Sequence, residues 1–175
     1  DSASSYKKDG TTILDYDATL FNVAVGEGAL ASASLTGTYN VATGYQSLYS
    51  NTTGNYNVAS GYQSLYLNTT GSGNIATGAN SLFSNTAGHN NVATGANSLY
   101  NNTAGHYNVA SGYQSLHSNT AGSYNVATGT NSLYSNTAGY YNIASGYQSL
   151  YSNTTGSHNV ASGYQAGRYQ ADGTT

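Results

Sequence analysis

Hydrophobic and polar residues alternate along this chain in a short pattern that recurs almost from end to end. The copy at 108–124 reads NVASGYQSLHSNTAGSY, and the asparagine that opens it returns at fixed intervals. This asparagine is Asn22, Asn40, Asn57, Asn74, Asn91, Asn108, Asn125, Asn142 and Asn159, so the first interval is 18 residues and the following seven are 17. A fixed period of this length is typical of a solenoid, in which each repeat packs only against its neighbours.

Each copy predicts two short strands and two corners. The segment N-V-A-[S/T] alternates apolar and polar residues and favours a strand. The glycine after it permits a bend; it is Gly44, Gly61, Gly78, Gly95, Gly112, Gly129, Gly146 or Gly163. The next segment, Q-S-L-Y-S, is predicted as a second strand centred on Leu48, Leu65, Leu82, Leu99, Leu116, Leu133 or Leu150. Asn-Thr-[Thr/Ala]-Gly then predicts a turn, in which asparagine bonds to its own backbone and glycine supplies a positive φ.

These elements predict an all-β fold, a β-solenoid or β-roll of 17-residue coils with two short strands per coil. Successive coils would stack ~4.8 Å apart through parallel pairing. Helix is not expected, because glycine recurs within every copy and no 3.6-residue apolar stripe is present. A coil of this kind encloses a narrow core and leaves apolar surface exposed. We therefore expect a homotrimer, intertwined or side by side, with a monomeric solenoid as the alternative.

The repeat also sets the expected domain organisation. Residues 1–20 are interpreted as an N-terminal lead-in or cap, with a turn at 7–10 and a short strand at 11–14. Residues 21–39 form a degenerate first repeat, 40–158 seven regular repeats, and 159–175 a C-terminal partial repeat. The chain begins at Asp1, contains no methionine and ends in DGTT, which predicts a segment of a longer protein.

Formal charge is confined to the two ends of the chain. All nine Lys, Arg, Asp and Glu residues lie in 1–27 or 168–175. We expect no nucleic-acid partner, because phosphate binding needs clustered Lys and Arg. Membrane insertion is not expected either, because no apolar run approaches ~20 residues. Without cysteine there is no disulfide framework or thiolate metal site.

Two stretches of the repeat resemble known families. Residues 22–26, NVAVG, resemble the N-x-V-A-I-G repeat in the head domains of trimeric autotransporter adhesins. Residues 57–71, NVASGYQSLYLNTTG, are similar to a longer repeat in phage and prophage tail-fibre proteins, and the closing GYQAGRYQADGTT resembles the segment that follows it there. The resemblance covers about residues 21–175 and implies a trimeric left-handed β-roll that forms a stalk or head.

One position departs from the adhesin pattern. Its isoleucine before glycine is replaced here by Thr43, Ser60, Thr77, Thr94, Ser111, Thr128, Ser145 or Ser162. We therefore expect the face that this strand buries to be more polar than in that family.

Tyrosines recur in two registers. The first holds Tyr45, Tyr62, Tyr113, Tyr147 and Tyr164, and the second holds Tyr49, Tyr66, Tyr100, Tyr134 and Tyr151, together with Phe83 and His117. We interpret both as packing ladders; the alternative is a strip that binds a sugar or receptor. In the first register tyrosine is followed by glutamine, whereas Ala79, Ala96 and Thr130 are followed by asparagine. These small pairs could leave local grooves for a ligand.

Other candidate sites have simpler interpretations. His89 and His106 share a register and could share a metal, but the repeats supply no carboxylate or thiol, so a surface ladder is expected. Four N-x-[S/T] sequences, which begin at Asn51, Asn68, Asn101 and Asn153, are read as turn chemistry and not as glycosylation sites. Asp15, Asp17 and Glu27 could bind a cation, although solvated cap residues are expected.

The same composition predicts no catalytic, cofactor or metal residues. Glycoside cleavage needs two placed carboxylates, and 28–167 contains none. We therefore expect a non-enzymatic fibre segment of a phage or phage-like tail fibre on the virion, which contacts itself and a host glycan or protein receptor. A bacterial trimeric adhesin head at the cell surface is one alternative. An ice-binding β-solenoid is another, because Thr52, Thr69, Thr86, Thr103, Thr120, Thr137 and Thr154 form a regular column.

Overall fold

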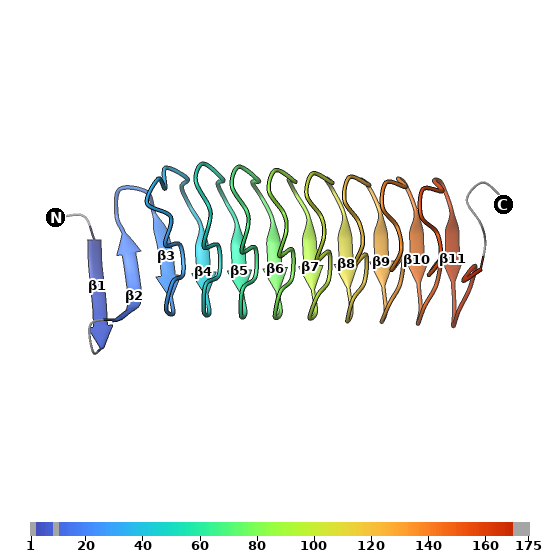
Figure 1. Cartoon of the computed structure of the whole chain (residues 1–175), viewed down its shortest axis with the longest axis horizontal. Helices are drawn as coiled ribbons and strands as arrows, with labels where there is room; N and C mark the ends of the chain where they lie inside the picture. The colour runs from blue at the N-terminus through green and yellow to red at the C-terminus, as the bar shows by residue number, and fades with distance from the viewer. Residues whose placement is uncertain (1–2, 9–10, 170–175) are drawn as a thin grey trace.

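The chain forms one elongated solenoid whose strands lie across its long axis and follow one another along it in chain order (Figure 1). The computed structural model describes residues 3–8 and 11–169. Within these residues, eleven strands form a single sheet in chain order. They are β1 Ala3–Lys8, β2 Thr11–Asp17, β3 Asn22–Val25, β4 Val41–Thr43, β5 Val58–Ser60, β6 Ile75–Thr77, β7 Val92–Thr94, β8 Val109–Ser111, β9 Val126–Thr128, β10 Ile143–Ser145 and β11 Val160–Ser162. No helix occurs in this part of the chain, so the predicted all-β solenoid is confirmed.

Parallel pairing joins each coil to the next in perfect register. Val41 and Ala42 of β4 pair with Val58 and Ala59 of β5, and the same positions pair from β3 through β11. Because each regular strand sits 17 residues after the last, identical side chains stack in columns along the solenoid.

An antiparallel hairpin adjoins the first coil. β1 pairs with β2, and β2 pairs with β3 through Leu14 opposite Val25 and Asp17 opposite Asn22. The strand predicted at 11–14 lies within β2. The turn predicted at 7–10 was placed too early, because Lys7 and Lys8 belong to β1, and its remaining residues, 9–10, lie outside the described part of the chain.

The second predicted strand of each coil is wrong. In the coil that begins at Asn108, Gln114 and Leu116 have φ values of 54° and 50°, in the left-handed region. Their backbone N–H groups still reach the neighbouring coils: Gln114 donates to Ala96 O at 3.0 Å and Leu116 donates to Ser132 O at 2.9 Å. The left-handed residues turn two consecutive side chains, Ser115 and Leu116, into the interior. An extended strand would send one of them outward.

The apolar interior consists mainly of two columns. One alanine from each strand and one leucine from each turn segment are buried, as Ala110 and Leu116 are in the middle of the chain. The residues beside the alanine face outward, so Thr94 is exposed in β7. Within the single chain the Thr and Ser residues therefore share the outer face with Val and Ile, and a more polar buried face stays a prediction about the trimer.

The interior also holds a ladder of the asparagines that open each copy. Asn91 shows the pattern: its backbone N–H and its side-chain Nδ2 both donate to Asn74 Oδ1, at 3.0 and 3.1 Å. Nδ2 also donates to Gly105 O at 2.8 Å. Its Oδ1 accepts in turn from the N and Nδ2 of Asn108, at 3.0 and 3.2 Å. Every hydrogen-bonding atom of this buried amide therefore has a partner, as burial of a polar group requires.

A second ladder uses the asparagine of the closing turn. Asn102 Nδ2 donates to Asn85 Oδ1 at 2.8 Å and to Gly105 O at 3.0 Å, while its Oδ1 accepts from Asn119 Nδ2 at 2.6 Å. The carbonyl of Gly105 thus accepts one bond from each ladder. The closing turn ends in glycine for a steric reason and not because of the predicted positive φ. A Cβ at Gly105 would overlap the carbonyl oxygen of Gly122 and the side chain of Asn102.

The glycine that ends each strand behaves as predicted. Gly112 has a φ of 136°, and a Cβ on it would lie 2.7 Å from the carbonyl carbon of Gly129. Both the backbone conformation and the close approach of the next coil exclude a side chain at this corner.

We predict that Asn91→Asp lowers the free energy of unfolding by about 3 kcal/mol or more, because it removes two buried donors and buries a carboxylate. Chemical denaturation followed by circular dichroism measures the loss. The buried carboxyl should bind its proton more tightly in the folded chain than in the unfolded chain. Part of the loss should therefore be recovered below about pH 4.

The matched control is Asn55→Asp. Asn55 Oδ1 accepts from the N and Oγ1 of Thr38 at 2.8 and 3.0 Å, and a carboxylate accepts the same bonds. This variant should stay close to the unchanged chain. An equal loss in both variants would contradict the ladder argument.

Candidate functional site

The outer face of the sheet carries an apolar strip along the solenoid. We define this strip as the outward Val and Ile residues of the regular strands: Val41, Val58, Ile75, Val92, Val109, Val126 and Ile143. The exposed fractions of these side chains range from 37% at Val126 to 48% at Ile143, except that Val92 is only partly exposed. A contiguous apolar column is unusual on a monomer surface and marks a surface made for contact.

A third aromatic column, which the sequence did not predict, borders this strip. Tyr39, Tyr56, Tyr107, Tyr124 and Tyr141 each precede an opening asparagine and have φ values between 55° and 60°. Their rings stack where neighbouring coils both carry one, as between Tyr39 and Tyr56 at a centroid separation of 5.1 Å. The signal in the sequence was tyrosine in the position before asparagine.

The two predicted tyrosine registers form ladders of different depth. The register of Tyr49 gives an unbroken stack of seven rings through Phe83 and His117 to Tyr151, with centroids 5.0 to 5.3 Å apart. Most of these rings are half-buried, which is the arrangement that the packing interpretation predicts. The register of Tyr45 is exposed and forms only stacked pairs, Tyr45 with Tyr62 and Tyr147 with Tyr164.

The correlated Gln and Asn positions form side-chain hydrogen bonds between some neighbouring coils. Gln63 Nε2 donates to Gln46 Oε1 at 2.8 Å, and Asn80 Nδ2 donates to Asn97 Oδ1 at 3.3 Å. Gln165 Nε2 likewise donates to Gln148 Oε1 at 3.1 Å, so these amide pairs form where two adjacent coils carry the same residue. Gln114 stands between Asn97 and Asn131, and Asn131 Oδ1 has no partner among the described residues, so the pairs do not extend into a continuous ladder.

The geometry of His89 and His106 favours a ladder over a metal site. Their rings are stacked with centroids 5.3 Å apart and planes within 6°. Each Nδ1 accepts a backbone N–H, from Ser72 at 2.9 Å and from His89 at 3.0 Å. Among the described residues no group of three or more His, Asp or Glu side chains could hold a metal ion.

The asparagines of three N-x-[S/T] sequences are structural. Asn51, Asn68 and Asn153 are buried, and the Nδ2 of each donates to the carbonyl of the glycine three residues later. Asn101 is partly exposed, and the ladder asparagine of its coil is Asn102. The interpretation as turn chemistry is therefore confirmed for the three buried asparagines.

The acidic residues lie at the junction of hairpin and solenoid. Asp15 and Glu27 line a pocket of about 260 Å³ there. Asp17 Oδ1 accepts from Thr19 Oγ1 at 2.6 Å and Thr19 N at 2.8 Å. These bonds lower the pKa of Asp17, the side-chain bond contributing most. Asp17 is therefore engaged in a local turn.

The threonines of the column that suggested ice binding donate their hydroxyl hydrogens to backbone carbonyls of the next coil. Thr103 Oγ1 donates to Thr120 O at 3.1 Å, and Thr69 Oγ1 donates to Thr86 O at 2.9 Å. The column also follows the closing turn and not the flat sheet. An ordered water layer would find only the acceptor half of each hydroxyl there.

We predict that stability falls on acidification below about pH 6.5. Burial lowers the pKa of His106 and His117 from 6.5, and the charge of His89 adds to the effect at His106. A histidine with a lowered folded-state pKa stabilises the fold in its neutral form. Its contribution is therefore present above the unfolded pKa and is lost as the pH falls through and below that value. Denaturation midpoints at about pH 7.5 and 5 measure the difference.

The control for this prediction keeps the contacts and removes the titration. His106→Ser retains an acceptor at its register, and His117→Tyr restores the ring that the other coils carry. The double variant should show a smaller pH dependence. An unchanged pH dependence would contradict the assignment to these two side chains.

Within the described residues there is no helix of the length and hydropathy that a membrane crossing needs. No family model matches the chain, and neither curated proteins nor solved structures yield a significant match. The functional argument therefore depends on the surface and architecture of the chain itself.

Proposed function

We propose that this chain is a structural and adhesive segment of a phage or phage-like tail fibre. It would form a trimeric shaft or head that presents a receptor-binding part of the fibre or contributes to host-receptor binding itself. Its place would be the virion tail fibre, outside the host cell. The observation that carries the proposal is the apolar strip. It runs along the solenoid from Val41 to Ile143 and has no covering element within the described chain.

Self-association is the simplest way to cover this strip. Residues 28–167 carry no formal charge apart from histidine, so two copies of the face meet without charge repulsion or buried ions. An apolar face that repeats every coil also fits another copy of the same chain, because the spacing of the two faces is identical. Three copies around one axis would cover all three strips.

The architecture suits a mechanical role. Each coil pairs only with the coils before and after it, so the length of the rod scales with the number of repeats. Hydrogen bonds and stacked rings along the axis are neutral, and salt should therefore affect the assembly little. A trimer would also multiply weak receptor contacts through avidity.

A bacterial trimeric adhesin head at the cell surface rests on the same features. A membrane-anchor segment in the longer protein would favour the adhesin, and a tail-fibre chaperone domain would favour the phage fibre. An ice-binding solenoid is tested separately by a thermal-hysteresis assay. Hysteresis from the monomeric chain would favour that alternative.

We predict a solution mass near three times the 18.0 kDa of one chain, with an elongated shape, by light scattering and sedimentation. The double variant Val109→Lys and Val126→Lys places two charges on the strip and should give a monomer. Its circular dichroism should stay unchanged, because both side chains face outward.

The matched control places lysines on the turn segment that follows the buried leucine of each coil, at Ser118 and Ser135, and should remain a trimer. A monomeric unchanged chain would contradict the trimer. Dissociation by the control alone would move the interface to that turn segment.

A further inference from the structure

One column of residues along the solenoid supplies a side-chain acceptor to the coil before it. These are the residues two positions before each opening asparagine. Asn55 N–H donates to Ser72 Oγ at 3.0 Å, His106 N–H to Ser123 Oγ at 3.0 Å, and Tyr140 N–H to Ser157 Oγ at 3.0 Å. Each short side chain therefore satisfies a backbone donor at the edge of the solenoid.

Tyr140 interrupts this column. Its phenolic oxygen is separated from the backbone by the whole ring and does not accept the N–H of Ser123. That N–H has no hydrogen-bond partner among the described residues. The Ser123 N–H occupies the position from which the His106 N–H donates to the following coil, so the repeat places Tyr140 opposite it. An unpaired amide donor is costly once it is shielded from water and is available to a ligand.

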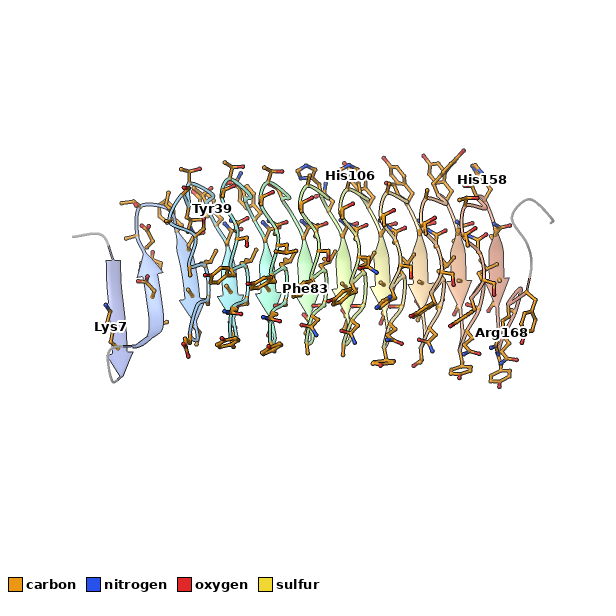
Figure 2. All side chains as sticks on the ribbon, in the orientation of Figure 1. Lys7, Tyr39, Phe83, His106, His158 and Arg168 are labelled. Carbon is orange, nitrogen blue, oxygen red and sulfur yellow. The ribbon has the colours of Figure 1, made fainter. Side chains whose placement is uncertain are left out.

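Three tyrosine rings line the same pocket as Ser123. Tyr124 and Tyr141 stack with centroids 4.9 Å apart, and Tyr141 stacks on His158 at 5.3 Å. The ring of Tyr140 stands across them, at 78° to Tyr141 and 80° to His158. His158 lies at the same edge of the solenoid as His106 (Figure 2). The crossed rings make a corner that the other coils lack, because none of them carries tyrosine at this register.

The corner is a surface pocket of about 210 Å³. Its lining consists of Tyr124, Tyr140 and Tyr141, the small residues Ala121 and Ala138, and Ser123. No residue of the apolar strip lines it, so covering the strip leaves these side chains outside the covered column. Concave, mainly apolar surfaces with one or two polar groups are typical of small-molecule sites.

The lining selects the chemistry of a ligand. No side chain in the pocket carries a charge, so a neutral ligand fits it best. Tyrosine faces pack against the C–H face of a pyranose ring. An acetamido group offers a carbonyl acceptor for the Ser123 N–H and a methyl group for the alanine side chains.

We propose that the pocket between Tyr124 and Tyr140 binds a neutral N-acetylated saccharide. The Tyr140 and Tyr141 rings hold the sugar, and the Ser123 N–H donates to its acetamido carbonyl. This inference rests on the proposed function in one respect, since it identifies the receptor-binding part of the fibre segment with a host glycan. A trimer would carry three such pockets, which raises the avidity for a surface covered with the sugar.

The test compares two neutral trisaccharides, fully N-acetylated chitotriose and cellotriose. The first carries an acetamido group on each ring where the second carries a hydroxyl. Saturation-transfer NMR and titration of tyrosine fluorescence on the full chain should show chitotriose bound at least about tenfold more tightly than cellotriose. Tyr140→Ser should weaken chitotriose binding by about tenfold or more. It removes the ring and also gives the Ser123 N–H the acceptor that other coils provide.

A second variant and a control complete the design. Ala138→Thr narrows the pocket with a residue that other copies carry at this register and should also weaken binding, while Tyr140 stays in place. Tyr113→Thr removes an exposed tyrosine from another column and should leave binding unchanged. Serine occurs in neighbouring coils at the register of Tyr140, so the fold should survive this exchange.

Equal binding of the two trisaccharides, or undiminished binding by Tyr140→Ser, would overturn the inference. Light scattering on the same samples separates it from the proposed fibre. A trimer that binds neither sugar would remove the pocket and leave the fibre, whereas a monomer that binds chitotriose would do the reverse.

Discussion

The solenoid depends on one backbone carbonyl in each coil, that of the glycine which closes the turn. Gly105 O accepts both the amide of Asn91 and the amide of Asn102, so two ladders of buried asparagine meet at one atom. Each ladder asparagine must lie directly above its equivalent, which restricts the spacing of the repeat. The 18-residue first interval obeys the same condition. Asn40 N and Nδ2 still donate to Asn22 Oδ1, at 2.8 and 3.2 Å, and the connection between them accommodates the extra residue.

This construction reverses the usual distribution of residues. The interior is filled largely by asparagine, serine, alanine and one leucine per coil, while valine, isoleucine and most tyrosines face outward. Ladders along the axis satisfy the buried amides of the opening and closing-turn asparagines, as at Asn91 and Asn102, so the single chain has order without a large apolar core. The apolar residues are then free to form contacts with other molecules. A fibre that assembles sideways and stays neutral along its length follows from this arrangement.

Regular stacking also explains how a repetitive rod acquires a local site. Side chains in most columns can be exchanged without breaking the ladders, provided that they do not supply an essential acceptor. Tyr140 is an exchange that does remove one, since Ser123 loses its partner while three tyrosine rings line the same pocket. Gly73 is the contrasting case, where a glycine in the left-handed position removes a ring from the tyrosine column. Variation between copies therefore acts on the surface and leaves the interior unchanged.

The sequence by itself determined the period, the all-β class, the strand at Val109–Ser111, the glycine corner at Gly112 and the lack of Lys, Arg, Asp and Glu in residues 28–167, because these follow from spacing and residue type. Only the tertiary structure decided which side each residue faces. Leu116 and Ser115 both turn inward because left-handed residues flank Ser115, a conformation that their side chains do not signal. An exposed apolar surface was expected, but only the structure showed that the strand turns its Val and Ile outward and its Ala inward. The pocket at Tyr140 was not predictable, because it arises from contacts between coils.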